Sequence, residues 1–493
     1  MRIAVIGGGP AGLYFALLAK KTWPANDITV YERNAADDTF GFGVVFSDET
    51  LDNFLARDPE SYDDITGQFA YWDEIDFGET VRSTGHGFCG CGRVELLKIL
   101  QRRCIALGVE MKFSHDIGNI ADIDADLVVG ADGINSVVRE AFADRFRPRI
   151  DMRKNRFAWL GTTRPYDAFT FDFTTDDHGI WVLGAYQYKP GMSTWIVEAP
   201  ERTWANAEAA VGSLADEAQF PMIRCAAWSH DRYTLIGDAL HTAHYSIGSG
   251  TKLAMEDSIA LVDALAETDT IAAAQARFEE IRREEVEKTQ HASEVSVIWT
   301  EEPQRYWDMA LLQAAFSMLS RSKQVTYENL RLRDPALIAR IDSWFAGEVR
   351  AAGHETAPDT PPMFAPFSLR GMTLANRVVV SPMDMYSSTG GIPGEFHFVH
   401  LGSMALGGAG LVFSEMACIS AAGRITPGCS GIYTDDHVAA WKHIIDFVHD
   451  NSDAKFCLQI GHAGRKGSTR VAWEGMDKPL TEGNWEVIAP SPL

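Results

Sequence analysis

Three glycines near the amino terminus have the spacing of a pyrophosphate-binding loop. Gly7, Gly9 and Gly12 form the pattern G-x-G-x-x-G between an apolar, strand-like run at residues 2–6 and a predicted helix that reaches about Lys21. In such a loop the first glycine permits a tight turn, the second lets the backbone approach the pyrophosphate, and the third lets the helix pack against the strand. The pattern predicts a dinucleotide site, although a glycine-rich turn without a ligand has the same sequence.

Glu32 is placed to bind a ribose. It follows a second predicted strand at residues 27–31, where a carboxylate can accept hydrogen bonds from both ribose hydroxyls. The same charge repels a 2′-phosphate, so this ribose belongs to FAD or NAD. Arg33, the next residue, is predicted to bind the cofactor as well. These residues alone leave FAD and NAD undecided.

Two later segments distinguish between the cofactors. Residues 126–133 end in Asp132-Gly133, and residues 233–241 contain Gly237-Asp238. They resemble the D-G and G-D motifs of the class A flavoprotein monooxygenases. The resemblance implies that the cofactor is FAD, that Asp238 accepts hydrogen bonds from its ribityl chain, and that Asp132 and Gly237 belong to the same site.

A glycine pair and an arginine extend the resemblance. Gly248 and Gly250 precede a predicted helix at residues 251–266. By the resemblance, the N-terminus of this helix faces the flavin pyrimidine ring and stabilises the anionic reduced flavin. Arg93, which opens a helical stretch at residues 94–107, matches an arginine that lies beside the flavin and ribityl chain in this family.

The sequence departs from the family at two positions near the glycine pair. Tyr245 replaces the usual proline, and Lys252 replaces the usual asparagine. Lys252 either adds positive charge near the pyrimidine edge or faces solvent. His244 can act as an acid or a base near neutral pH, but a histidine that only packs fits at least as well. The resemblance implies NADH or NADPH as electron donor and O2 as co-substrate. Because the flavin supplies most of the reactivity, His244 and Tyr245 are weak catalytic candidates.

Strand-like segments between about residues 156 and 200 fit the β-sheet substrate domain of this family. Their aromatic residues include Trp159, Phe171 and Trp181. These residues suit a flat aromatic substrate, but they suit the core of an ordinary sheet even better. An FAD-dependent monooxygenase is therefore expected at residues 1–345, with its substrate sheet at about 156–200.

A second domain is expected after a linker at residues 346–362, which is predicted from its glycines and prolines. Residues 363–493 resemble the Old Yellow Enzyme family of FMN-containing barrel reductases, chiefly in residues 363–367, 374–383 and 458–465.

The resemblance implies a second flavin site in a completed domain. Its flavin contacts would be Pro382, Met383, Asp384 and Gln459, and Tyr386 would face the substrate. Many relatives have cysteine or threonine at the position of Asp384. A carboxylate beside the flavin would disfavour additional negative charge or would have to be protonated.

Residues 363–493 are too few for a closed barrel, which needs about 250 residues. The chain is expected to be a fragment or to come from a truncated gene model, and FMN is expected only for a full-length second domain. The predicted fold class is α/β: a Rossmann-like FAD-binding fold with an inserted β-sheet substrate domain, followed by an incomplete (β/α)8 barrel.

The fusion itself resembles the bifunctional aryl-CoA monooxygenase/reductases, which act on 2-aminobenzoyl-CoA or salicylyl-CoA. That resemblance implies hydroxylation at ring carbon 5, which is activated by the amino or hydroxyl group para to it, and later reduction of the ring. Arginines and lysine at residues 145–156 could bind the CoA phosphates, or they form a solvated strand. A hydroxylase of a free phenolic or anthranilic acid and a non-catalytic flavin-binding module remain alternatives.

Composition excludes several other classes. A net charge of −24 argues against nucleic acid as a partner, and no apolar run approaches the roughly 18 residues of a membrane span. Seven cysteines suit a reducing cytoplasm better than a disulfide scaffold, and no metal site is expected because Cys89 and Cys91 have no second ligand pair. A homodimer is a possible assembly.

Overall fold

The computed structural model describes residues 1–38, 41–78, 80–212 and 217–491 of the 493-residue chain. The chain forms two compact units, Met1–Ile338 and Ala339–Leu493. The division falls inside helix α12 (Pro335–Ala351). The first residues of the predicted linker are therefore helical, because Ile341, Ala346 and Val349 continue the buried apolar stripe of this helix.

The first unit is built on a six-stranded sheet of order β15-β16-β9-β1-β2-β8. Neighbouring strands are parallel, except β15 and β16. The strands are β1 (Arg2–Ile6), β2 (Asp27–Tyr31), β8 (Glu110–Lys112), β9 (Leu127–Gly130), β15 (Ser229–His230) and β16 (Tyr233–Leu235). Every residue of β9 is buried, as expected for a parallel strand covered on both faces. The loops after β1, β2 and β9 therefore open at the same edge of the sheet.

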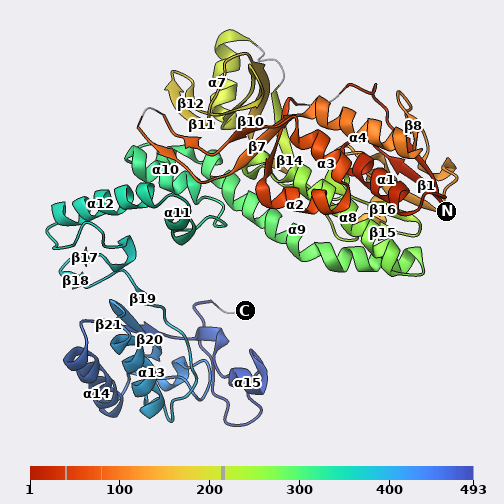
Figure 1. Cartoon of the computed structure of the whole chain (residues 1–493). Helices are drawn as coiled ribbons and strands as arrows, with labels where there is room; N and C mark the ends of the chain where they lie inside the picture. The colour runs from red at the N-terminus through yellow and green to blue at the C-terminus, as the bar shows by residue number, and fades with distance from the viewer. Residues whose placement is uncertain (39–40, 79, 213–216, 492–493) are drawn as a thin grey trace. The chain divides into compact units, whose positions relative to one another are not determined.

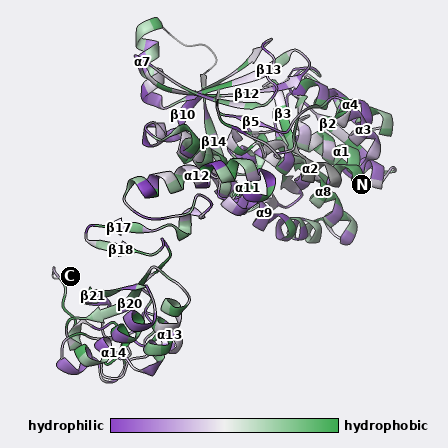
Figure 2. Ribbon diagram, turned by 60° about the vertical axis from the view of Figure 1, so that its left-hand side comes forward, coloured by the Kyte–Doolittle hydropathy of each residue, from purple (hydrophilic) through white to green (hydrophobic). Residues whose placement is uncertain are grey.

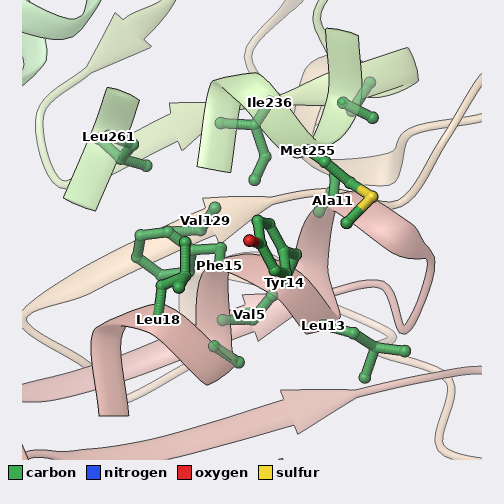
Figure 3. Close-up of a cluster of buried hydrophobic side chains, with 14 of the residues drawn as sticks. Val5, Ala11, Leu13, Tyr14, Phe15, Leu18, Val129, Ile236, Met255 and Leu261 are labelled. Atoms are coloured by element: carbon green, nitrogen blue, oxygen red, sulfur yellow. The ribbon is translucent and has the colours of Figure 1, made fainter. Parts of the chain in front are cut away.

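Helix α1 (Pro10–Thr22) anchors the loop that follows β1. It is buried from Pro10 to Ala19, and α4 (Arg93–Leu107) and α8 (Gly250–Glu267) pack against it (Figure 1). Figure 3 shows Tyr14 and Phe15 of α1 in the same cluster as Val129 and Ile236. This core holds the two sequence-distant motif strands against the first helix.

A seven-stranded sheet of order β14-β10-β13-β12-β11-β5-β6 forms the second layer of this unit (Figure 2). Its strands are β5 (Ile75–Asp76), β6 (Arg82–Ser83), β10 (Pro148–Thr162), β11 (Phe169–Asp176), β12 (Gly179–Lys189), β13 (Met192–Ala199) and β14 (Glu217–Cys225). The sheet extends beyond residues 156–200. Two of the added strands have only two residues each, too few for a recognisable alternation of polar and apolar side chains.

Smaller elements complete the first unit. A three-stranded sheet has the order β3-β7-β4, from Gly43–Ser47, Phe88–Gly92 and Ala70–Trp72. The remaining helices are α2 (Asp48–Arg57), α3 (Pro59–Thr66), η1 (Ile120–Asp122), α5 (Val137–Ala141), α6 (Ala143–Phe146), α7 (Glu201–Val211), η2 (Gly237–Ala239), η3 (Tyr245–Ile247), α9 (Ile271–Glu301), η4 (Pro303–Tyr306), α10 (Leu311–Leu319) and α11 (Tyr327–Arg333).

The second unit contains a parallel sheet of order β19-β20-β21. Its strands and helices alternate as β19 (Val379–Val380), α13 (Glu395–Leu406), β20 (Leu411–Cys418), α14 (Asp435–Asn451) and β21 (Lys455–Gly461). A hairpin of β17 (Phe367–Leu369) and β18 (Met372–Leu374) precedes them, and short helices occur at η5 (Pro362–Phe364), η6 (Ala421–Gly423), η7 (Gly464–Lys466) and α15 (Ala472–Gly475).

No helix among the described residues is sufficiently long and apolar to cross a membrane.

Candidate cofactor and substrate site

A cavity of about 580 Å³ in the first unit connects the predicted motifs. The predicted site residues that line it are Gly7, Gly9, Glu32, Arg33, Arg93, Asp132, Asp238 and Tyr245. The predicted residues that do not line it are Gly12, Gly237, His244, Gly248, Gly250 and Lys252. The first group comes from loops after three parallel strands, from the start of α4 and from η2 and η3, so one cavity reaches the glycine loop, the D-G and G-D segments and Arg93, but not the glycine pair at Gly248 and Gly250.

The three loop glycines have different surroundings. Gly7 has a φ of +109°, and a Cβ on Gly12 would stand 2.1 Å from the Gly7 carbonyl oxygen. Both positions therefore exclude larger residues for reasons of backbone conformation and packing. Around Gly9 no atom lies within 4 Å of a Cβ position. The open space beside Gly9, at the N-terminus of α1, fits an anionic group such as a pyrophosphate.

Glu32 is fixed beside this loop by two backbone donors. Its Oε2 accepts a hydrogen bond from Gly8 N at 2.6 Å, and its Oε1 accepts one from Asn34 N at 2.8 Å. Farther along the cavity wall, the rings of Tyr31 and His115 lie 5.4 Å apart. This end of the cavity thus joins a carboxylate with flat side chains, which suits a nucleoside.

Asp132 has one occupied and one open carboxylate oxygen. Oδ2 accepts a hydrogen bond from Val137 N at 2.7 Å, whereas the buried Oδ1 has no partner among the described residues. Burial raises the pKa of Asp132. An unsatisfied acceptor in a cavity wall fits a ligand hydroxyl, because a buried polar atom without a partner is costly.

Arg93 and Asp238 both line the cavity, and their opposite charges act on each other. Burial lowers the pKa of Arg93, and the carboxylate of Asp238 opposes this shift. Burial likewise raises the pKa of Asp238, against the effect of Arg93. The pair offers a cation and an acceptor to one bound molecule, and each partly compensates the burial of the other.

Two buried side chains hold the motif segments together. Arg139 donates to the carbonyl oxygens of Ala239 at 2.8 Å and Ile134 at 2.5 Å, and thereby joins the D-G and G-D segments. Asp257 on α8 accepts a hydrogen bond from Gly237 N at 2.9 Å. Arg139 and Asp257 therefore help to position Asp238, although neither residue lines the cavity.

Part of the cavity wall is aromatic. Phe157, Trp159, Phe220 and Tyr245 line it. The ring centroid of Tyr245 is 4.8 Å from that of Phe157 and 5.7 Å from that of Phe220. Gly41 (φ +83°) packs against the indole of Trp159, which would lie 3.2 Å from a Cβ atom at position 41. The walls form an apolar slot for a flat ring.

His244 and Lys252 have structural partners. The imidazole of His244 is 1% exposed and accepts a hydrogen bond from Ser246 N at 3.2 Å. Burial lowers the pKa of His244 to about 3, with a further contribution from Arg153 and Arg321. The imidazole is therefore neutral near pH 7. Lys252 Nζ lies 3.6 Å from Glu256 Oε1 on the next turn of α8.

The basic segment at residues 145–156 is partly neutralised. Arg153 forms a bidentate pair with the buried Glu301, at 3.0 and 2.5 Å. Arg145 lies 3.4 Å from Asp144, and Arg156 lies 3.7 Å from Glu201. The cations of this segment without an ion pair among the described residues are Arg147, Arg149 and Lys154, and all three are exposed.

In the second unit, the predicted residues gather at the carboxyl ends of the parallel strands. Pro382, Met383, Asp384 and Tyr386 follow β19, and Gln459 is paired with Met416 of β20. Asp384 Oδ1 accepts a hydrogen bond from Met416 N at 3.1 Å, and burial raises the pKa of Asp384. These ends are where barrel enzymes place their active sites.

Comparisons with known proteins relate the first unit to aromatic monooxygenases. The chain is 36% identical to the salicyloyl-CoA 5-hydroxylase of a Streptomyces species over 431 residues, 79% of this chain and 81% of that protein. It is 34% identical to the 3-hydroxy-4-methyl-anthranilyl-(aryl-carrier protein) 5-monooxygenase of Streptosporangium sibiricum, over 67% of this chain and 97% of that protein. The tetrameric form of 2-methyl-3-hydroxypyridine-5-carboxylic acid oxygenase shares the fold, with a TM-score of 0.52 and 18% identity over 67% of this chain and 95% of that one.

The second unit matches a different family. The model of the NADH:flavin oxidoreductase / NADH oxidase family matches residues 362–483. The NADPH dehydrogenase of Listeria welshimeri is 43% identical over 106 residues, which are 21% of this chain and 31% of that protein.

The fold, the cavity and these relatives define a flavoprotein oxidoreductase whose first unit is a monooxygenase. The chain belongs to the family of flavoprotein monooxygenases that includes salicyloyl-CoA 5-hydroxylase. The predictions of an α/β fold, a flavin cofactor and a monooxygenase followed by a flavin-reductase segment are thereby confirmed.

Proposed function

We propose that the first unit binds FAD in this cavity and hydroxylates ring carbon 5 of an aryl-CoA. The observation that carries the proposal is the continuous cavity from the glycine loop to the aromatic slot. Bound FAD, reduced by NADH or NADPH, supplies the chemistry that transfers one oxygen atom from O2 to the ring.

The residues of the chain have separable tasks in this proposal. Gly9 and the N-terminus of α1 hold the pyrophosphate, and Glu32 accepts hydrogen bonds from the adenosine ribose. Asp238 and Arg93 orient the ribityl chain and the flavin. The aromatic slot positions the substrate ring and excludes water.

The names of two relatives support position 5 and an activated acyl group. One acts on salicyloyl-CoA, the other on an anthranilyl group of an aryl-carrier protein, and both names give position 5. A hydroxyl or amino group para to carbon 5 donates electron density to it, which makes that carbon the nucleophile. This supports 2-aminobenzoyl-CoA or salicylyl-CoA as the substrate.

The CoA phosphates require cations, for which Arg147, Arg149 and Lys154 are the candidates. Replacing all three by alanine should raise the KM for the CoA ester by about tenfold or more and leave the KM for the free acid unchanged. NADH oxidation stimulated by each substrate gives both constants. Equal KM values for wild type and variant with the CoA ester would exclude this phosphate site, and stimulation by the free acid alone would favour a free-acid hydroxylase.

For the second unit we propose a reductase site at the carboxyl ends of β19, β20 and β21, with FMN held weakly by the residues present. Stoichiometric FMN released from purified chain would contradict weak binding. A homodimer and a cytoplasmic location stay predictions, for which sedimentation and cell fractionation are the tests.

A further inference from the structure

One part of β10 is an open edge of the seven-stranded sheet. On one side β10 pairs with β14 over residues 148–152, but on the other side its pairing with β13 begins only at Arg156. Residues 149–152 are all exposed, and Ile150 and Met152 are each 51% exposed. An open strand edge can pair with a further strand, because its backbone donors and acceptors are unused.

The backbone groups of Ile150 and Met152 point out of this edge. Ile223 lies opposite Ile150 on β14, and its N–H donates to Thr242 Oγ1 at 2.7 Å, while its carbonyl oxygen accepts from Thr242 N at 3.1 Å. Ile223 thus bonds away from β10, so Ile150 and Ile223 are a non-hydrogen-bonded pair. Because bonded and non-bonded pairs alternate in an antiparallel ladder, Ile150 and Met152 both direct their N–H and C=O groups to the open side.

The side chains of this segment form one charged row and one apolar row. Successive side chains of a strand point to opposite faces, so Arg149 and Asp151 share one face and Ile150 and Met152 share the other. The contact of Asp151 with Arg153, two residues along, agrees with this alternation, at 3.3 Å. An edge with both rows exposed needs a partner strand that carries the same two rows.

A second copy of the chain meets this need in one register. A two-fold axis makes the edge its own antiparallel partner, with each residue opposite the one equally far beyond the axis. An axis at Arg149 or at Asp151 would set like charges opposite each other. An axis at Ile150 instead sets Arg149 of each copy opposite Asp151 of the other. Opposite charges and apolar pairs across strands are stabilising, whereas like charges are destabilising.

The same register uses the outward backbone groups. The Ile150 N–H of each copy meets the Ile150 carbonyl of the other, and the Met152 N–H meets the Pro148 carbonyl. Pro148 has no N–H, and Arg147 before it has a φ of +48°, so the pairing ends there. At the other end Arg153 is held by Glu301, at 3.0 and 2.5 Å, and is therefore already neutralised.

We propose that two copies of the chain associate through residues 148–152 of β10, around a two-fold axis at Ile150. This interface goes beyond the proposed function, which needs only one copy. Of the three candidate cations for the CoA phosphates, Arg149 then faces the second copy, and Arg147 and Lys154 lie outside the paired rows.

Sedimentation of the full chain with FAD measures the dissociation constant of the dimer. Because a short strand edge buries a small area, the wild-type Kd is expected within about 1–100 µM. Arg149→Asp and Asp151→Arg each set like charges opposite each other at both ends of the row, and each should raise the Kd about tenfold or more. Arg145→Asp makes the same change of charge at an exposed position of α6 and should leave the Kd unchanged.

Restoring the charge pattern distinguishes this register from a general effect on the fold. The double variant Arg149→Asp/Asp151→Arg again sets opposite charges against each other, and its Kd should return to within about threefold of wild type. Asp151→Arg also removes the contact with Arg153, but the double variant lacks that contact too. An equimolar mixture of the two single variants should form a mixed dimer more tightly than either variant pairs with itself.

A backbone change tests the hydrogen bonds. Ile150→Pro removes an outward N–H that has no partner among the described residues, and should raise the Kd about tenfold or more. Ile150→Val keeps the N–H and the strand preference and should dimerise as wild type does. Circular dichroism checks the fold of each variant.

A wild-type chain that stays monomeric over this range would overturn the inference. So would single charge variants with the wild-type Kd, or a double variant that dimerises as poorly as the single ones, because the charges would then not face each other. A monomeric Ile150→Pro chain that still hydroxylates the aryl-CoA would support the interface and leave the proposed function in place.

Discussion

Gly9 and Gly12 belong to one motif but face different neighbours. A methyl group at Gly9 would enter the open cavity, whereas one at Gly12 would meet the Gly7 carbonyl oxygen at 2.1 Å. Gly9→Ala should therefore leave the free energy of unfolding of the apo chain within about 0.5 kcal/mol of wild type and raise the Kd for FAD at least about tenfold. Gly12→Ala should lower the free energy of unfolding by about 1–3 kcal/mol.

Urea unfolding of the apo chains and FAD titration separate the two effects. If Gly9→Ala binds FAD as wild type does, the pyrophosphate does not approach Gly9 and this part of the site is misassigned.

His244 should affect stability below neutral pH. Its pKa is about 3 in the fold, because of burial, and 6.5 is its ordinary value. Between these values the unfolded chain binds a proton that the folded chain does not, so stability declines as pH falls from 6.5. His244→Gln should reduce this slope, measured by urea unfolding between pH 6.5 and about 5. His291→Gln, at an exposed position of α9, is the control and should keep the wild-type slope; the same slope in His244→Gln would contradict the buried neutral imidazole.

At the residue scale, the sequence predicted the motif side chains but not their partners. Gly9, Glu32 and Asp238 have local signatures, because a tight turn or a strand end demands particular residue types. Phe157 and Phe220 have none, since each lines the cavity from a strand whose neighbours in sequence lie elsewhere. Only the pairing of β10 with β14 shows that they share one cavity.

At the scale of elements, Asp58 connects three helices of the first unit. It caps α3 through Ser61 N at 3.1 Å and accepts hydrogen bonds from Lys21 of α1 at 2.8 Å and Arg103 of α4 at 2.9 Å. Although burial alone would raise the pKa of Asp58, Arg103, Lys21 and Ser61 hold it well below the ordinary value of 3.8. This carboxylate stabilises the fold above pH 3.8, and the contribution is lost as pH falls below that value.

Asp58→Asn should lower the free energy of unfolding at neutral pH by about 2 kcal/mol and weaken the loss of stability in acid. Asp64→Asn is the matched control on the same helix. The side chain of Asp64 is 63% exposed, and its ion pair with Arg102 is long, at 3.7 Å. Its effect should stay within about 0.5 kcal/mol. Equal effects of the two changes in thermal or urea unfolding would show that Asp58 does not join the helices.

The predicted boundaries of helices agree with the observed ones where the helical repeat of apolar residues dominates the sequence. The helix predicted at residues 251–266 is Gly250–Glu267, and the helix predicted at 94–107 is Arg93–Leu107. The substrate sheet was predicted less completely, because β5 and β14 join it from outside residues 156–200 and their order depends on long-range pairing. Helix α12 continues to Ala351, within residues 346–362, because its apolar stripe runs past Gly347.

At the scale of the whole molecule, the chain joins two flavin-related units. The first has the cavity and the monooxygenase relatives, whereas the second presents the strand ends of a reductase fold. In the proposed order of reactions, the first unit oxidises the ring and a reductase site then acts on the product. The second reaction therefore depends on oxygen insertion in the first unit.

The most direct test is incubation of the purified chain with FAD, NADH, isotopically labelled O2 and either 2-aminobenzoyl-CoA or salicylyl-CoA. Mass spectrometry and NMR then locate any new oxygen. The proposal predicts a CoA ester that carries one labelled oxygen atom at ring carbon 5. NADH oxidation that produces only hydrogen peroxide, or hydroxylation confined to the free acids, would contradict it.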